Sequence, residues 1–82
     1  MNTTKKLVLE AVRERCATEW SQEDVKTYLE LFPVCVSYVQ PLFVDKLLSC
    51  GVTKEEVLGA VEVVGPLSRS TYKRVEKHLA KV

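Results

Sequence analysis

Side chains that can act as nucleophiles, general acids or metal ligands are few and scattered in this sequence. The only histidine, His78, lies among Lys73, Arg74 and Lys77, with no carboxylate next to it in the sequence to orient it as a base. A Cys–His pair could arise only through folding. We therefore expect no catalytic residue, no metal site, no cofactor and no small-molecule substrate, so the protein is predicted not to be an enzyme.

The three cysteines are an odd number at wide spacings. Cys16, Cys35 and Cys50 fit neither a disulfide framework nor a CxxC zinc or redox motif. We interpret them as reduced, buried, small apolar residues, with a functional thiol as the alternative. Reduced cysteines are typical of an intracellular protein, either cytoplasmic or nuclear.

Acidic pairs and glycines also have structural explanations. Glu23–Asp24 and Glu55–Glu56 fall at predicted helix starts, where carboxylates stabilise the positive end of the helix dipole. The three glycines are dispersed and form no phosphate-binding loop. No apolar run approaches the roughly 20 residues that span a bilayer. The only apolar stretch near the start, Leu7, Val8 and Leu9, is too short for a signal-peptide core, so we expect neither membrane insertion nor secretion.

The elements that would position any site are predicted to be helices. Residues 4–16 repeat apolar side chains at helical spacing. Ser21 can cap a second helix, with Asp24 at its third position, Trp20 packing on Val25 as a hydrophobic staple, and Pro33 ending it. The predicted inward-facing residues are Leu7, Val8, Ala11, Val12, Cys16, Val25, Tyr28, Leu29 and Phe32.

The middle of the chain is less regular. Residues 34–39 contain β-branched side chains that favour a strand, but no partner strand is evident, so we expect a short helix or an extended link. Pro41 suits the first turn of a third helix over residues 42–49, which Gly51 can close. Its predicted inward residues are Leu42, Phe43 and Leu47, with Cys50 as a further candidate.

Two more helices complete the chain. Thr53 and Glu56 predict a capping box that starts the fourth helix, and Gly65–Pro66 predicts its end. The last helix is expected to begin near Ser68 or Ser70. The predicted inward residues of these two helices are Val57, Leu58, Ala60, Val61 and Val64, then Tyr72, Val75, Leu79 and Val82.

These elements predict an all-α fold, a compact bundle of four to five short helices in a single domain over residues 1–82. Residues 1–17 form an N-terminal helix that is either part of the bundle or an arm appended to it, and residues 20–82 form the helical bundle. A composition of 46% hydrophobic and 28% charged residues excludes the sparse hydrophobicity of disordered chains.

The formal net charge of +1 conceals a strong asymmetry. Residues 1–67 carry seven Lys and Arg against ten Asp and Glu, whereas residues 68–82 carry five against one. Spacing near four residues places most of these late cations on one solvent-facing stripe of the last helix. A solvated face is the plain alternative to a binding surface. The predicted partner-binding residues are Arg69, Ser70, Lys73, Arg74, Lys77 and Lys81.

From Trp20 onward, the order of landmarks resembles a sterile alpha motif (SAM) domain, a five-helix protein-interaction module. The matching residues are Trp20, Val25, Tyr28 and Leu29, then Leu47 and Leu48, then Thr53, Glu55 and Val57, then Val75 and Leu79. The resemblance implies association of an acidic region with the basic end helix. It implies Arg69, Lys73, Arg74 and Lys77 on the basic side and Asp45, Glu55 and Glu56 on the acidic side.

A second resemblance is to helix-turn-helix DNA-binding domains. The segment from residue 67 to residue 75, LSRSTYKRV, is similar to the start of a recognition helix. This resemblance implies that Arg69 and Ser70 face bases, that Thr71 and Lys73 face phosphates, and that Arg74 and Lys77 add non-specific attraction.

Together, these patterns predict a non-catalytic protein–protein interaction module or small protein-directed regulator that acts through a basic C-terminal helix. Its partner would be another protein or a second copy of itself. The alternative is a helix-turn-helix transcriptional regulator that binds DNA.

Overall fold

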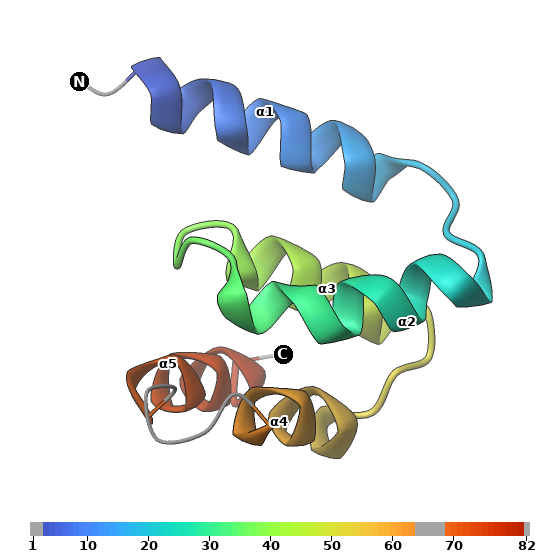
Figure 1. Cartoon of the computed structure of the whole chain (residues 1–82), viewed down its shortest axis with the longest axis vertical. Helices are drawn as coiled ribbons and strands as arrows, with labels where there is room; N and C mark the ends of the chain where they lie inside the picture. The colour runs from blue at the N-terminus through green and yellow to red at the C-terminus, as the bar shows by residue number, and fades with distance from the viewer. Residues whose placement is uncertain (1–2, 64–68, 82) are drawn as a thin grey trace.

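The computed structural model describes residues 3–63 and 69–81, and within them the fold is all-α. The helices are α1 (Thr3–Ala17), α2 (Gln22–Leu31), α3 (Gln40–Ser49), α4 (Lys54–Glu62) and α5 (Arg69–Leu79), with a short 3₁₀ helix over Phe32–Val34. They stack in three layers, with α1 above α2 and α3, and with α4 and α5 below (Figure 1). The predicted helical bundle is therefore confirmed.

Capping residues set the starts of α2 and α4, as the sequence predicts. The Ser21 hydroxyl accepts the backbone N–H of Asp24 at 3.2 Å, and the Ser21 N–H donates to the Asp24 carboxylate at 3.1 Å. At α4, the Thr53 hydroxyl accepts the Glu56 N–H at 3.1 Å, and the Thr53 N–H donates to Glu56 Oε1 at 3.1 Å. Each pair satisfies backbone donors that have no partner within the helix.

Replacing Thr53 with alanine is expected to lower the free energy of unfolding by about 1 kcal/mol, because loss of the cap leaves one backbone donor of the first turn without its acceptor. Urea unfolding followed by far-ultraviolet circular dichroism measures the change. Thr27, an exposed threonine inside α2, provides the control, since its replacement with alanine removes no cap. Equal midpoints for the two variants would show that the capping box does not stabilise α4.

The segment between α2 and α3 combines both predicted conformations. After the 3₁₀ helix, Cys35 is extended, with φ −78° and ψ 164°, and a turn over residues 37–39 leads into α3. Pro41 lies in the first turn of α3, and Gly51 follows the helix with φ +95°, a left-handed conformation that favours glycine.

α3 is the central helix because it packs against α1, α2 and α5. It is therefore buried on more than one side, and this corrects two predictions. Val44 is fully buried although we did not expect it to face inward, and Leu42 is only half-buried. Cys50 is exposed because it caps the C-terminal end of α3, where the chain turns away at Gly51.

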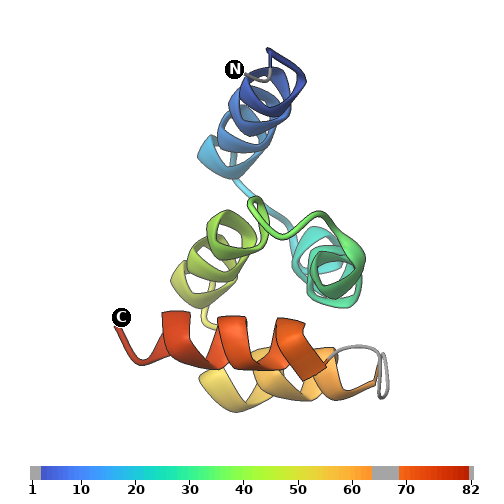
Figure 2. The ribbon, with the colours of Figure 1, turned by 90° about the vertical axis from the view of Figure 1, so that its left-hand side faces the viewer.

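The buried core comes from α3, α4, α5, the 3₁₀ helix and two residues that precede helices, Trp20 and Val39, whereas α1 and α2 contribute no fully buried residue. It consists of Trp20, Phe32, Val39, Phe43, Val44, Leu47, Val57, Val61, Val75 and Leu79. α1 contributes no fully buried residue and contacts α3 through half-buried side chains, among them Val8 and Val12. Leu7, predicted to face inward, is 59% exposed, and Ala11 is also exposed, because α1 has a neighbour on one side only (Figure 2).

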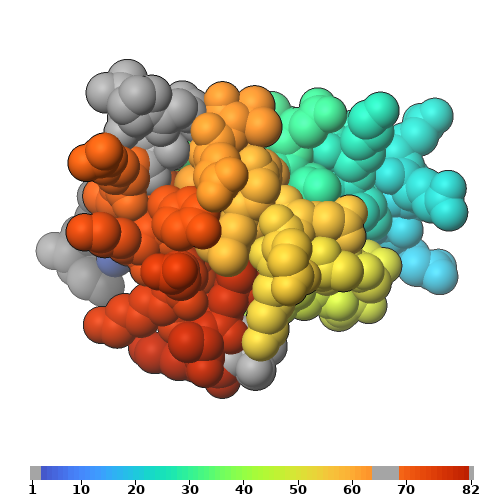
Figure 3. Space-filling view, turned by 90° about the horizontal axis from the view of Figure 1, so that it is seen from below, coloured from blue at the N-terminus to red at the C-terminus, as the bar shows by residue number. Residues whose placement is uncertain are grey.

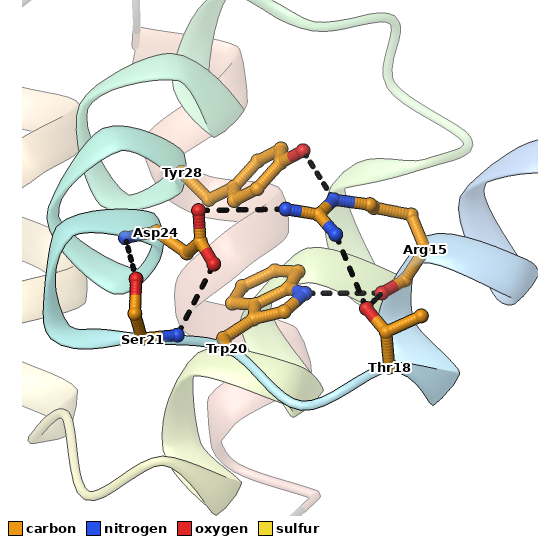
Figure 4. Close-up of polar contacts among 6 residues, drawn as sticks. All are labelled: Arg15, Thr18, Trp20, Ser21, Asp24 and Tyr28. Carbon is orange, nitrogen blue, oxygen red and sulfur yellow. Dashed lines mark hydrogen bonds and ion pairs between the residues drawn. The ribbon is translucent and has the colours of Figure 1, made fainter.

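A polar and aromatic cluster joins the end of α1 to α2 (Figure 4). The Trp20 ring stacks on Tyr28, with 4.4 Å between ring centroids, and its indole N–H donates to the carbonyl of Arg15 at 3.0 Å. The Arg15 guanidinium donates to the Tyr28 hydroxyl at 2.8 Å and lies 3.4 Å from the Asp24 carboxylate. The hydrogen bond to Tyr28 raises the pKa of Arg15 above its usual value. These contacts fix the angle at which the chain enters α2.

No helix in the described ranges is both long and apolar enough to cross a bilayer.

Candidate functional site

α5 presents a buried side and a cationic side. Thr71, Val75 and Leu79, at four-residue intervals, face the core. This corrects the predicted stripe, because Tyr72 is only half-buried and Thr71 takes its place. Val64 and Val82, also predicted to face inward, and the predicted helix end at Gly65–Pro66 lie outside the described residues.

The six predicted partner-binding residues are all exposed. They form what we call the cationic face, which comprises Arg69, Ser70, Lys73, Arg74 and Lys77 in α5 and Lys81 in the turn that follows. Within residues 3–63 and 69–81, none of these five cations lies within ion-pair distance of a carboxylate. α5 borders α4 on the lower layer of the molecule, where both helices are open to solvent (Figure 3). The cationic face is thus available to a partner.

Arg74 differs from the other cations because it lies at the edge of the buried side of α5. Its Nη2 donates to the Thr71 hydroxyl at 3.1 Å. This bond gives the buried hydroxyl a donor and ties the guanidinium to the preceding turn of α5. It also corrects the role that the helix-turn-helix resemblance implies for Thr71, since a buried threonine bonded within its own helix does not face a phosphate.

His78 has an acidic partner that is distant in sequence. Its Nε2 lies 2.7 Å from Oδ1 of Asp45, on α3, 33 residues earlier in the chain. The histidine is 26% and the aspartate 56% exposed by side chain, so the contact is at the surface. It joins α5 to α3 beside the cationic face and gives His78 a fixed orientation.

A small pocket opens between α5 and the start of α3. Its volume is about 50 Å³, which is room for three or four water molecules or one carboxylate group. Pro41, Val44 and Val75 form its apolar wall. The polar residues at its border are Ser37, Gln40, Arg74 and His78.

Gln40 is a buried polar residue with one oxygen unused. It is 3% exposed, and its side-chain amide donates to the backbone carbonyls of Pro33 at 3.3 Å and Cys35 at 3.0 Å. These two bonds identify the nitrogen and thereby place Oε1 on the other side of the amide. Oε1 has no hydrogen-bond partner within the described part of the chain. Because every fully buried side-chain N or O atom there has a partner, Oε1 must be accessible, and Gln40 borders the pocket.

The chain matches no protein-family model, no curated protein and no solved structure. Within the ranges that the structure describes, no group of three His, Cys, Asp or Glu side chains is placed to hold a metal ion.

The acidic residues implied by the SAM resemblance are partly engaged within the chain. Asp45 contacts His78, and Glu56 belongs to the α4 capping box. Glu55 is exposed in the first turn of α4. Asp45 therefore lies beside α5 within the same chain.

The cysteines are less buried than the sequence predicts. Cys16 and Cys35 are half-buried, and Cys50 is exposed, and all three are free thiols. Burial raises the pKa of the Cys16 and Cys35 thiols, which keeps both protonated at neutral pH and therefore weak nucleophiles. Their sulfurs lie near backbone carbonyls, Cys16 at 3.8 Å from Leu42 O and Cys35 at 3.4 Å from Leu31 O.

Sequence reasoning did not identify Ser37, Gln40 or the Asp45–His78 contact as parts of a site. One signal was present for Gln40, because it is a polar residue inside the mostly apolar segment 31–44. A polar side chain in such a segment must be hydrogen-bonded if the segment is buried. The Asp45–His78 contact had no local signal, since it depends on how α3 and α5 pack.

Proposed function

We propose that this protein is a non-catalytic interaction module that binds an acidic surface of a partner protein through the cationic face of α5. The observation that carries the proposal is the exposure of five cations within residues 69–81 without an ion pair to the described remainder of the chain. Exposed cations of one sign attract an oppositely charged surface and raise the rate of encounter with it. Thr71, Val75 and Leu79 anchor the helix in the core, so the face is presented on a rigid element.

DNA binding is the second candidate, and one observation favours it. Arg69 and Ser70 are exposed at the start of α5, where a recognition helix contacts bases. Two others weigh against it. Thr71 is buried, and α4 and α5 run side by side in opposite directions, whereas the two helices of a helix-turn-helix cross at about 90–120°. Figure 2 shows the two helices.

Salt dependence separates these two functions. Size-exclusion chromatography with light scattering, at two salt concentrations and with or without a short random DNA duplex, measures both self-association and DNA binding. A DNA-binding regulator would form a complex whose affinity falls steeply with salt, because each phosphate contact releases counterions. We expect little duplex binding even at low salt, and a salt-sensitive complex would favour the DNA alternative instead.

The cationic face itself is tested by reversing two of its charges. Arg69→Glu combined with Lys73→Glu is expected to weaken binding to a protein partner captured from the host by at least about 100-fold, since each reversal replaces attraction with repulsion worth about 1.4 kcal/mol or more. Both side chains are exposed, so the unfolding midpoint should not change.

The matched control is Arg13→Glu combined with Lys26→Glu. It makes the same change in net charge at exposed positions of α1 and α2. Isothermal titration calorimetry with the captured partner should give wild-type affinity for this control. Equal losses in both double variants would show that net charge, and not the cationic face, governs binding.

A further inference from the structure

We propose that the pocket between α3 and α5 binds the carboxylate of an acidic side chain of the partner, together with a backbone N–H next to it. This inference rests on the proposed function, because it names the group that the partner inserts beside the cationic face. The pocket is bordered by Ser37, Gln40, Arg74 and His78.

Arg74 supplies the charge for the carboxylate. One of its five N–H groups is used by the Thr71 hydroxyl, and no carboxylate of the described residues pairs with it. A guanidinium can hold a carboxylate through two parallel hydrogen bonds, which is the geometry it prefers. His78 Nε2 is already engaged with Asp45 Oδ1 at 2.7 Å. Arg74 is thus the group that makes the pocket attractive to an anion.

Ser37 and the start of α3 add to this attraction. Ser37 supplies a hydroxyl that can donate to a carboxylate oxygen. Gln40 and the neighbouring Pro41 are the first residues of α3, so the pocket opens at the positive end of that helix dipole. Both effects favour a negative charge, and the volume of about 50 Å³ limits it to a small group.

Gln40 favours a polypeptide over a nucleic acid. Its Oε1 is an acceptor without a partner among the described residues, on a residue that is only 3% exposed. A bound group that offers only anionic oxygens would leave this acceptor unsatisfied and would repel it. A sugar–phosphate backbone of DNA has no donor next to its phosphate, whereas a peptide places a backbone N–H close to each acidic side chain. The combination of Arg74 with a free amide oxygen therefore matches an aspartate or glutamate within a peptide.

A blocked amino acid tests the pocket without the partner. The probe is N-acetyl-aspartate amide, and the control probes are its neutral isostere N-acetyl-asparagine amide and inorganic phosphate. Proton–nitrogen correlation NMR of the whole chain should show saturable shifts at Ser37 and at the Gln40 side-chain amide with the aspartate probe. Neither control probe should produce them. The absence of saturable shifts with the aspartate probe, or equal shifts with phosphate, would overturn the proposal.

Two variants locate the binding groups. Arg74→Met keeps most of the aliphatic packing and should weaken probe binding at least tenfold, and Ser37→Ala, at an exposed turn residue, should weaken it severalfold. Lys26→Met removes the same charge from α2 and should leave the affinity within twofold of the wild type. Circular dichroism establishes whether each variant is folded. If Arg74→Met does not fold, Ser37→Ala still tests the pocket. Equal weakening by Lys26→Met would show that general charge attracts the probe and would overturn the proposal.

Failure of this inference is distinguishable from failure of the proposed function. If the probe does not bind the pocket while Arg69→Glu with Lys73→Glu still prevents partner binding, the interaction module stands and the pocket is excluded as its contact point. Arg69 and Lys73 do not border the pocket, so the two tests act on separate groups.

Discussion

Replacing Phe32 with alanine is expected to lower the free energy of unfolding by about 3–5 kcal/mol. Phe32 is fully buried where α2 passes into the 3₁₀ helix, and it is the largest side chain in the structure with no exposed surface. Its removal loses the free energy gained by burying the ring and leaves a cavity that the surrounding helices fill only in part. Domains have about 5–15 kcal/mol of stability in total, so this single change would remove a large part of it.

Urea unfolding followed by far-ultraviolet circular dichroism measures this loss. Leu31, the preceding residue, is 47% exposed, and its replacement with alanine should cost less than about 1 kcal/mol. The two variants remove apolar side chains from adjacent positions and differ mainly in burial. Similar costs would mean that Phe32 is not part of a close-packed core.

Replacing Trp20 with alanine is expected to have a comparable effect, about 3–5 kcal/mol, and also to loosen α1. Trp20 stacks on Tyr28, lies 6.3 Å from Phe43 between ring centroids, and bonds the carbonyl of Arg15 at the end of α1. Because α1 has no fully buried residue of its own, this junction carries much of its attachment to the bundle. Amide hydrogen exchange should therefore become faster in α1 than in α4.

Trp20→Phe separates the ring from the hydrogen bond. Phenylalanine keeps an aromatic ring that can stack on Tyr28 and loses the indole N–H, so we expect a cost of about 1 kcal/mol, the usual net contribution of one hydrogen bond, plus the loss of ring area. Since Trp20 is the only tryptophan, circular dichroism replaces fluorescence as the readout for both variants. A change in exchange that is uniform over α1 and α4 would argue that Trp20 supports the whole fold rather than the junction.

The cationic face and the pocket would act in different ways on a partner. The lysines are exposed to water, so each adds little binding energy by itself and chiefly attracts and orients an acidic surface. The pocket offers fixed groups, with Gln40 held by two backbone bonds and Arg74 held by Thr71. Fixed groups lose less freedom on binding, so the pocket would contribute more to the specificity of the complex.

Much of the helical framework could be predicted from the sequence because its signals are local. The capping boxes at Ser21 and Thr53 join residues three apart, and Gly51 closes α3 through its own backbone conformation. The cations of α5 follow the helical repeat, which places Lys73 and Lys77 on the side away from Val75. Such features depend only on neighbouring residues.

Only the tertiary structure decided what each helix surface meets. Gln40 and Val44 are buried because α3 lies between the other layers, and the sequence does not show how many neighbours a helix has. The Asp45–His78 contact spans 33 residues and exists only because α5 packs against α3. Periodicity gives the direction of a side chain, but burial and hydrogen bonding depend on the chain that packs against it. For that reason the cationic face was predictable by residue, whereas the pocket was not.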